Sequence, residues 1–288
     1  NALVNTFMSD DLTVNQDATL SKAQQVELYY LWARVLQHQH QFNLAEQALN
    51  QAQHLHQKQN TNVTLLKANV QLAQGEFNKA KSTCAELLGE AQLVTIAACT
   101  VEVTAQQGQL LESYQQMTTL LSRQPTFSNT SMDNWLLQIV SDIALQLGSF
   151  EEAQKWLEKG LTEGQSLHQK PLSFVVLWAD VQLALEQHQA VLVTLADIVN
   201  TAEFKDDALL SRLAIAETNT SQTHWQSLFK QRVELRIARN DLYHAADLAR
   251  YYIYVQPSAQ EAFRWASINW QQAKLSDDKM LLEKAKAM

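Results

Sequence analysis

The segment YYLWARVLQHQHQFNLAEQALNQAQHLHQ, residues 29–57, holds two apolar stripes separated by a short polar turn. Apolar residues three or four positions apart make the stripes: Leu28, Tyr29, Leu31, Trp32, Val35 and Leu36 in the first, and Phe42, Ala45, Leu49 and Ala52 in the second. This spacing predicts two amphipathic helices, and the turn is long enough only for a tight helix–helix connection. Two such helices cannot bury both stripes against each other, so the pair predicts neighbours of the same kind.

The same pattern recurs along the chain. Ala80, Ser113 and Ala153 take the position of Ala45, at successive offsets of 35, 33 and 40 residues. The turns of these three copies contain half of the six glycines in the chain, namely Gly75, Gly108 and Gly148. A left-handed residue that ends the first helix explains this placement. The recurrence therefore predicts an array of helical hairpins.

The repeated unit resembles the tetratricopeptide repeat (TPR), whose period is about 34 residues. The matching residues are Tyr29, Trp32 and Ala33 in the first helix and Ala45, Leu49 and Ala52 in the second. The resemblance implies an all-α fold, a right-handed superhelix of antiparallel helix hairpins. It also implies that the first helices line a concave surface on which a partner binds.

We expect one continuous solenoid over residues 21–288, after a mobile N-terminal arm (residues 1–20) that lacks a sustained apolar periodicity. Ser21 is suited to be the N-cap of the first helix. The predicted repeats cover residues 26–57, 61–89, 92–125, 133–164, 171–200, 222–257 and 259–287, with an extra helix at 205–217. One unpaired helix would reverse the alternation of first and second helices, so we expect a change in superhelix geometry near residues 200–225.

Composition limits the classes of function. The chain has 288 residues, of which 46% are hydrophobic and 18% charged, and it contains only three prolines. This favours a mainly helical protein with a sizeable core. A net charge of −8 argues against nucleic acid or an anionic membrane as the partner. No apolar run predicts membrane insertion. Because the chain begins with Asn1 and shows no leader, we expect a processed or trimmed chain.

The two cysteines fall on neighbouring predicted helices. Cys84 lies on the second helix of the second copy and Cys99 on the first helix of the third. Their distances from the intervening turn are nearly equal, so the hairpin brings them opposite each other and a disulfide is geometrically plausible. Two buried free thiols are the alternative. A disulfide would imply an oxidising compartment.

Three further stretches extend the resemblance. The cysteine pair, LLSRLAIAE at residues 209–217, and the C-terminal run that ends in ARYYIYVQPSAQEAFRWASINW are similar to those of bacterial extracytoplasmic TPR proteins. This likeness implies a periplasmic or secreted location, with a cytoplasmic location as the alternative. It implies no activity.

No motif predicts catalysis. The close histidine pairs, such as His38 and His40, are two residues apart and point in different directions on a helix. The sequence has no Cys/His cluster with zinc spacing, no phosphate-binding loop and no nucleophile motif. We therefore expect no enzyme activity, no metal and no cofactor.

Two register positions on the first helices predict a partner-binding groove. They give the candidate residues Tyr30, Arg34, Asn69, Glu102, Gln138, Asp142 and Asp180. TPR proteins that clamp a peptide carboxylate use Lys, Arg and Asn at such positions. Here three acids follow Arg34 and Asn69, so we expect an extended segment with basic side chains. The alternative is that these are solvated polar positions without a partner.

The C-terminal end is rich in aromatic residues. Tyr251, Tyr254, Trp265 and Trp270 predict either a second binding surface or a well-filled terminal core. Taken together, the sequence predicts a non-catalytic scaffold or adaptor for a protein or peptide partner in the bacterial envelope. The alternative is a structural or sensor and regulatory module of a larger assembly. The sequence does not predict the oligomeric state.

Overall fold

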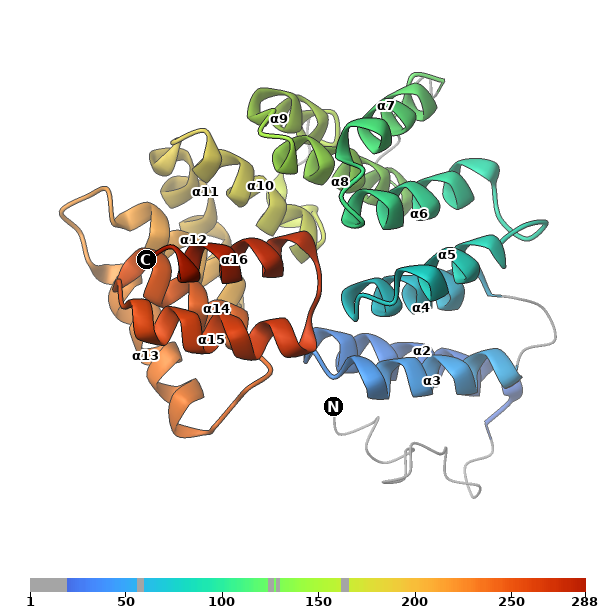
Figure 1. Cartoon of the computed structure of the whole chain (residues 1–288), viewed down its shortest axis with the longest axis horizontal. Helices are drawn as coiled ribbons and strands as arrows, with labels where there is room; N and C mark the ends of the chain where they lie inside the picture. Colours follow the sequence, from blue (N-terminus) through green and yellow to red (C-terminus); the bar gives the residue numbers. More distant parts are fainter. Residues whose placement is uncertain (1–19, 56–59, 124–126, 128–129, 162–165) are drawn as a thin grey trace. The chain divides into compact units, whose positions relative to one another are not determined.

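The structure, a computed structural model, describes residues 20–55, 60–123, 127, 130–161 and 166–288 (Figure 1). All regular secondary structure in these residues is helical, as expected from a chain with six glycines and three prolines. The predicted N-terminal arm lies outside the described residues apart from Leu20.

The chain divides into two compact units, each described here by itself. Unit 1 consists of residues 1–107 and 271–275, and unit 2 of residues 108–270 and 276–288. One apolar core lies within unit 1, around Ala33, Leu36 and Leu49. A larger core lies within unit 2, around Leu137, Phe174 and Trp265. One continuous solenoid through both units remains a prediction.

Unit 1 is built from helical hairpins. Its helices are α2 (Lys22–His38), α3 (Phe42–Leu55), α4 (Thr61–Ala73), α5 (Phe77–Ala85) and α6 (Leu93–Gln106). In Figure 1, α2 with α3 and α4 with α5 lie side by side as pairs. The short segment 271–275 also belongs to this unit, where the Lys274 backbone N donates to the Ala73 carbonyl O at 2.8 Å.

Unit 2 contains the remaining helices. They are α7 (Leu110–Leu121), α8 (Ser131–Gln146), α9 (Phe150–Glu158), η1 (Leu167–Gln169), α10 (Leu172–Ala184), α11 (His188–Thr201), α12 (Asp207–Glu217), α13 (His224–Ala238), α14 (Ala245–Arg250), η2 (Tyr251–Val255), α15 (Ala259–Gln272) and α16 (Ser276–Lys286). The last two residues of α15 are counted with unit 1. The predicted extra helix is present as α12, which contacts α10, α11, α13 and α14. A change in superhelix geometry beside it remains a prediction.

Several of the helices have a side-chain cap at the N-terminus. Ser21 caps α2 as predicted, because its Oγ accepts from the Gln24 backbone N while the Gln24 side chain accepts from the Ser21 backbone N. Thr130 and Asp133 form the equivalent capping box at the start of α8. These local bonds satisfy backbone N–H groups that the first helical turn leaves free.

The turns after the first helices share one backbone conformation. Gly75, Gly108 and Gly148 have φ values of 77°, 93° and 75°, which confirms the predicted left-handed turns. Three residues other than glycine adopt the same conformation at corresponding turns: His40, Glu186 and Asn240. The turns thus provide a structural reference point for comparing one hairpin with the next.

Candidate partner-binding surface

The left-handed turn residues define an equivalent position on successive first helices. The predicted residues Arg34, Asn69, Glu102, Asp142 and Asp180 each stand six residues before such a turn residue. The residue before each of them is buried: Ala33, Ala68, Val101, Ser141 and Ala179. A buried residue followed by a polar one that is at least partly exposed therefore recurs on α2, α4, α6, α8 and α10. We call the polar positions, with Tyr30 and Gln138, the first-helix surface, and each unit carries its own part of it.

Unit 1 carries four residues of the first-helix surface. Arg34 is exposed, and its guanidinium carbon lies 5.9 Å from the centre of the Tyr30 ring. Asn69 on α4 accepts a hydrogen bond from Gln37 Nε2 on α2, so it also links two first helices. Glu102 is partly buried on α6. These side chains combine a cation, an aromatic ring, an amide and a carboxylate.

Unit 2 carries the other three residues of the first-helix surface, and the acid on α8, Asp142, has a shifted pKa. The pKa of Asp142 is raised to about 7. Desolvation is the main cause, the hydrogen bond from Gln146 opposes it, and the nearby Asp277 and Asp180 carboxylates add to the rise. Gln146 Nε2 donates to Asp142 Oδ2 at 2.6 Å. Gln138 donates to the Asn134 carbonyl within α8. Asp142 is therefore partly protonated near neutral pH.

Asp180 is held in an ion pair that the sequence did not predict. Arg212 on α12 donates from Nε to Oδ1 and from Nη2 to Oδ2 of Asp180, both at 2.8 Å. The Arg212 side chain is 4% exposed, whereas that of Asp180 is 33% exposed. A two-pronged contact of this kind fixes the carboxylate and neutralises its charge. The one signal in the sequence is that Arg212 is the single basic residue in the mainly apolar stretch LLSRLAIAE.

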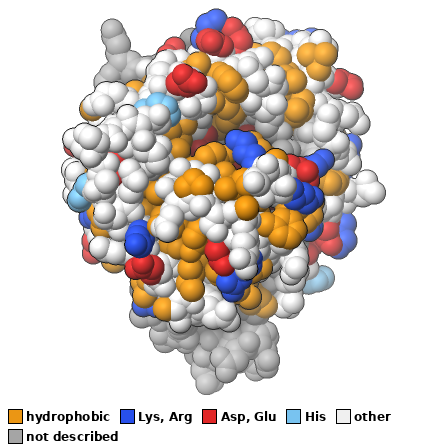
Figure 2. Space-filling view, turned by 60° about the vertical axis from the view of Figure 1, so that its left-hand side comes forward, with side chains coloured by type: hydrophobic (Ala, Val, Ile, Leu, Met, Phe, Trp, Pro, Cys, Tyr) orange, Lys and Arg blue, Asp and Glu red, His pale blue; other side chains and the backbone are white. Residues whose placement is uncertain are grey.

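A second arginine holds the end of unit 2 together. Arg250 contacts Asp277 on α16, and its Nη1 lies 3.7 Å from Asp247 Oδ1. Burial by itself lowers the pKa of the Arg250 guanidinium, but the surrounding carboxylates, Asp277 foremost, raise it above its ordinary value. Asp180, Asp247 and Asp277 are thus partly balanced by Arg212 and Arg250. Figure 2 shows one face on which apolar, acidic and basic side chains are interleaved.

The C-terminal aromatic residues do not form the predicted second surface as a set. Tyr251 is 3% exposed and Trp265 is 2% exposed, so for these two residues the structure has the terminal core, one of the two alternatives expected from the sequence. They belong to the core of unit 2, where the Phe229 and Tyr251 ring centres lie 5.7 Å apart. Tyr254 and Trp270 are partly buried. The Tyr254 hydroxyl accepts a hydrogen bond from Lys284 Nζ on α16.

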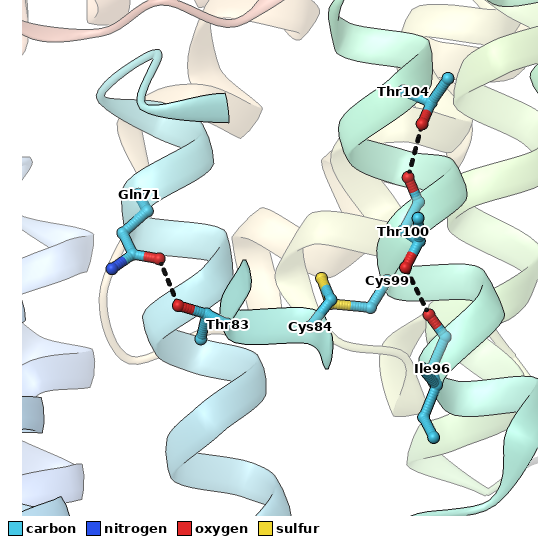
Figure 3. Close-up of a disulfide and its surroundings, with 7 residues drawn as sticks. All are labelled: Gln71, Thr83, Cys84, Ile96, Cys99, Thr100 and Thr104. Carbon is cyan, nitrogen blue, oxygen red and sulfur yellow. Dashed lines mark hydrogen bonds between the residues drawn. A yellow bond between two sulfur atoms is a disulfide. The ribbon is translucent and has the colours of Figure 1, made fainter. Parts of the chain in front are cut away.

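A disulfide joins Cys84 of α5 to Cys99 of α6 (Figure 3). The two Cα atoms are 5.7 Å apart, and both side chains are buried, at 0% and 3% exposure. Beside the bond, the Thr83 hydroxyl donates to Gln71 Oε1 of α4 at 2.8 Å. Of the two alternatives expected from the sequence, the structure therefore has the disulfide.

Two further findings concern groups that could bind metal or enter a membrane. Within the described residues, no cluster of three or more His, Cys, Asp or Glu side chains is arranged to hold a metal ion. None of the helices described is both long and apolar enough to cross a bilayer.

The fold is similar to that of a solved TPR structure. A tetratricopeptide repeat protein from Parabacteroides merdae matches with a TM-score of 0.51 at 14% identity, over 91% of this chain and 99% of that chain. This similarity confirms the predicted all-α TPR-like fold. PilF of Pseudomonas aeruginosa matches with a TM-score of 0.45 at 11% identity, over 85% of this chain and 98% of that one. The C-terminal part of a TPR repeat-containing protein from Cytophaga hutchinsonii gives 0.40 at 11% identity, over 88% and 98%. No family model and no curated protein matches the sequence.

Proposed function

We propose that the chain is a non-catalytic scaffold that binds an extended protein segment on its first-helix surface. The proposal rests on one recurring observation. On α2, α4, α6, α8 and α10, a polar side chain stands six residues before the left-handed turn residue and directly after a buried residue. A stack of repeats that presents side chains at a regular interval suits an extended ligand. A fold alone does not imply function, so the proposal rests on these side chains.

The partner we propose carries hydrogen-bonding groups and a small number of basic side chains. Asp180 is already paired with Arg212, so it offers a bound cation less than a free carboxylate would. Asp142 is partly protonated near pH 7 and becomes a stronger site for a cation above that pH. This partner is less basic than the one expected from three acids alone.

A pair of charge exchanges in unit 1 tests the proposal. A display library of unstructured 15-residue peptides is selected on the wild-type chain, and binding is then measured for Arg34→Glu/Glu102→Lys. The control is Lys22→Glu/Glu90→Lys, which exchanges the same charges at exposed sites outside the surface. Neither variant changes the net charge. We expect the surface variant to lose at least about tenfold in affinity, roughly 1.4 kcal/mol, and the control to bind as wild type.

Two results would contradict the proposal: selected peptides that bind both variants equally, or a selection that enriches no peptide. Circular dichroism of each variant checks that helicity is unchanged. We leave Asp180 out of the charge exchange, because a lysine there would face the Arg212 guanidinium and would perturb the fold as well as the surface.

We also propose an extracytoplasmic location. The buried Cys84–Cys99 disulfide supports it, since such bonds persist mainly in oxidising compartments. The test is the intact mass of protein taken from its native cells and alkylated without reductant. An unchanged mass is expected, whereas two added alkyl groups would rule out the disulfide and remove this support.

A further inference from the structure

Seven charged side chains from five helices of unit 2 lie close enough to act on one another electrostatically. Asp142 and Asp180 of the first-helix surface lie on α8 and α10, and Asp277 lies in the first turn of α16. The other members are Arg212 on α12, Asp247 and Arg250 on α14, and Asp278 on α16. We call these seven residues the charged cluster.

Both arginines of the charged cluster pair with aspartates. Arg212 donates two hydrogen bonds of 2.8 Å to Asp180. Arg250 contacts Asp277 on α16, and its Nη1 lies 3.7 Å from Asp247 Oδ1. Burial alone lowers the pKa of Arg250, but the surrounding carboxylates, Asp277 foremost, raise it above its ordinary value. Arg250 is thus a cation that holds the first turn of α16 to α14.

The charged cluster contains more carboxylates than its two arginines can neutralise. Asp278 Oδ1 accepts a hydrogen bond from Asn269 Nδ2 at 2.7 Å, and Asp142 Oδ2 accepts one from Gln146 Nε2 at 2.6 Å. An amide stabilises a carboxylate but adds no positive charge. A proton on Asp142 therefore removes a negative charge that the arginines leave unbalanced.

Asp142 is the acid of the cluster that titrates near neutral pH. Its pKa is raised to about 7, mainly by desolvation, and the Asp277 and Asp180 carboxylates add to the rise. At acidic pH, Asp142 is neutral and does not repel Asp277. Once Asp142 is ionised, its negative charge acts against Asp277, because like charges that share a site repel.

The repulsion acts on a helix with a small apolar anchor. α16 buries three apolar side chains, Leu281, Leu282 and Ala285, whereas α8 buries six. An element with few buried apolar contacts opens at a lower free-energy cost than a well-buried one. The first turn of α16 is therefore the side of the contact that moves when Asp142 and Asp277 are both charged.

We propose that Arg250 and a proton on Asp142 together hold the first turn of α16 in place, and that this contact loosens as the pH rises from acidic to neutral. When α16 moves away, the pKa of Asp142 falls toward its ordinary value of about 3.9. The open form then loses a proton that the closed form keeps. Closure is strongest at acidic pH, weakens as the pH rises to about 7, and then stays constant.

The contact involves only groups of unit 2 and does not rest on the proposed function. Asp142 and Asp180 also belong to the first-helix surface. If that surface binds a partner, the position of α16 regulates its part in unit 2, and this consequence alone rests on the proposed function.

Hydrogen exchange of the full chain tests the proposal. The exchange of residues 276–286 is measured at about pH 5 and about pH 8 and corrected for the intrinsic rate at each pH. We expect the opening equilibrium of α16 to increase at least about threefold, and roughly 80-fold if the pKa of Asp142 returns fully to its ordinary value. Asp142→Asn should remove the increase. The control Glu203→Gln makes the same change of carboxylate to amide at an exposed site and should behave as wild type.

Two variants of α16 separate the pH response from a merely structural role. Asp277→Asn removes the contact with Arg250, so α16 should exchange faster at both pH values, and it removes the charge that Asp142 repels, so the pH dependence should shrink. Glu283→Gln, exposed on the same helix, should keep the wild-type dependence. An Asp277→Asn chain with the full pH dependence would overturn the proposal. So would a wild-type chain without pH dependence, or an Asp142→Asn chain that keeps it.

Discussion

At the residue scale, Gly75 differs from the other turn glycines in its surroundings. A Cβ atom on Gly75 would lie 2.9 Å from Cβ and Cγ of Lys274, whereas a Cβ on Gly148 would meet nothing within 4 Å. Both have positive φ, at 77° and 75°, so alanine costs each about 1–2 kcal/mol in backbone strain. Gly75→Ala must also displace Lys274, so we expect it to lower the unfolding free energy more than Gly148→Ala. Chemical denaturation compares them, and equal losses would contradict the contact.

Because the pKa of Asp142 is raised in the folded chain, we expect the free energy of unfolding to depend on pH. Its folded-state pKa is raised to about 7, whereas an unfolded aspartate titrates near about 3.9. Between these values the folded chain keeps a proton that the unfolded chain has lost. The contribution of Asp142 to stability is therefore full below about pH 4, falls as the pH rises to about 7, and then stays constant.

The isosteric variant Asp142→Asn isolates this contribution. We expect the unfolding free energy of the variant, relative to wild type, to increase by at least about 1 kcal/mol between roughly pH 4.5 and 8. The full shift would correspond to about 4 kcal/mol, which partial exposure of the side chain reduces. Urea denaturation at several pH values measures the difference. A difference that does not change with pH would show that Asp142 titrates normally.

The sequence predicted residues whose role is local better than residues whose role depends on packing. Ser21 and Gly75 act within one turn of the chain, so their roles could be predicted from neighbouring residues. The Asp180–Arg212 pair joins α10 to α12, and no periodicity specifies which side chain meets Asp180. For Trp265 the sequence left a surface and a terminal core as alternatives, because it does not specify which residues of other helices pack on the ring. The structure places Trp265 in the core of unit 2.

At the element scale, the disulfide fastens α5 to α6. Its cysteines are 15 residues apart in sequence, and closing a loop of that length is worth about 3 kcal/mol. We expect Cys84→Ala/Cys99→Ala to destabilise unit 1 by at least about 3 kcal/mol, because the packing loss for two small side chains adds to the loss of the crosslink. Denaturant unfolding of wild type with and without reductant provides the control. An unchanged midpoint would indicate that the bond contributes nothing to stability.

The connection between α12 and α13 depends on a buried acid. Glu217, the last residue of α12, is 0% exposed, and its Oε2 accepts from the Gln226 backbone N in the first turn of α13 at 2.8 Å. A carboxylate is favourable at a helix N-terminus. We expect Glu217→Ala to cost about 1–3 kcal/mol and Glu234→Ala, on the exposed side of α13, less than about 0.5 kcal/mol. Thermal unfolding compares them; similar losses would contradict the capping role.

At the scale of the whole molecule, repetition explains why the fold was predictable and the partner was not. Each hairpin repeats the same packing problem, so the apolar pattern of residues 29–57 describes the rest of the array. The first-helix surface does not repeat in chemistry: it presents Arg34, Asn69, Glu102, Asp142 and Asp180 at one register position. The sequence thus predicted a recurring register position, at which we propose that a partner binds. It did not predict that Arg212 of another helix neutralises Asp180 there.

The two compact units predict two unfolding transitions, since each has its own core. The disulfide lies entirely in unit 1, as does Trp32, whereas the other six of the seven tryptophans lie in unit 2. In a Trp32→Phe variant, tryptophan fluorescence therefore reports on unit 2 alone, while circular dichroism reports on both units. We expect reductant to shift part of the dichroism transition to lower denaturant and to leave the fluorescence transition in place. If both signals shift together, the units unfold as one cooperative structure, because loss of a crosslink in one would then destabilise the other.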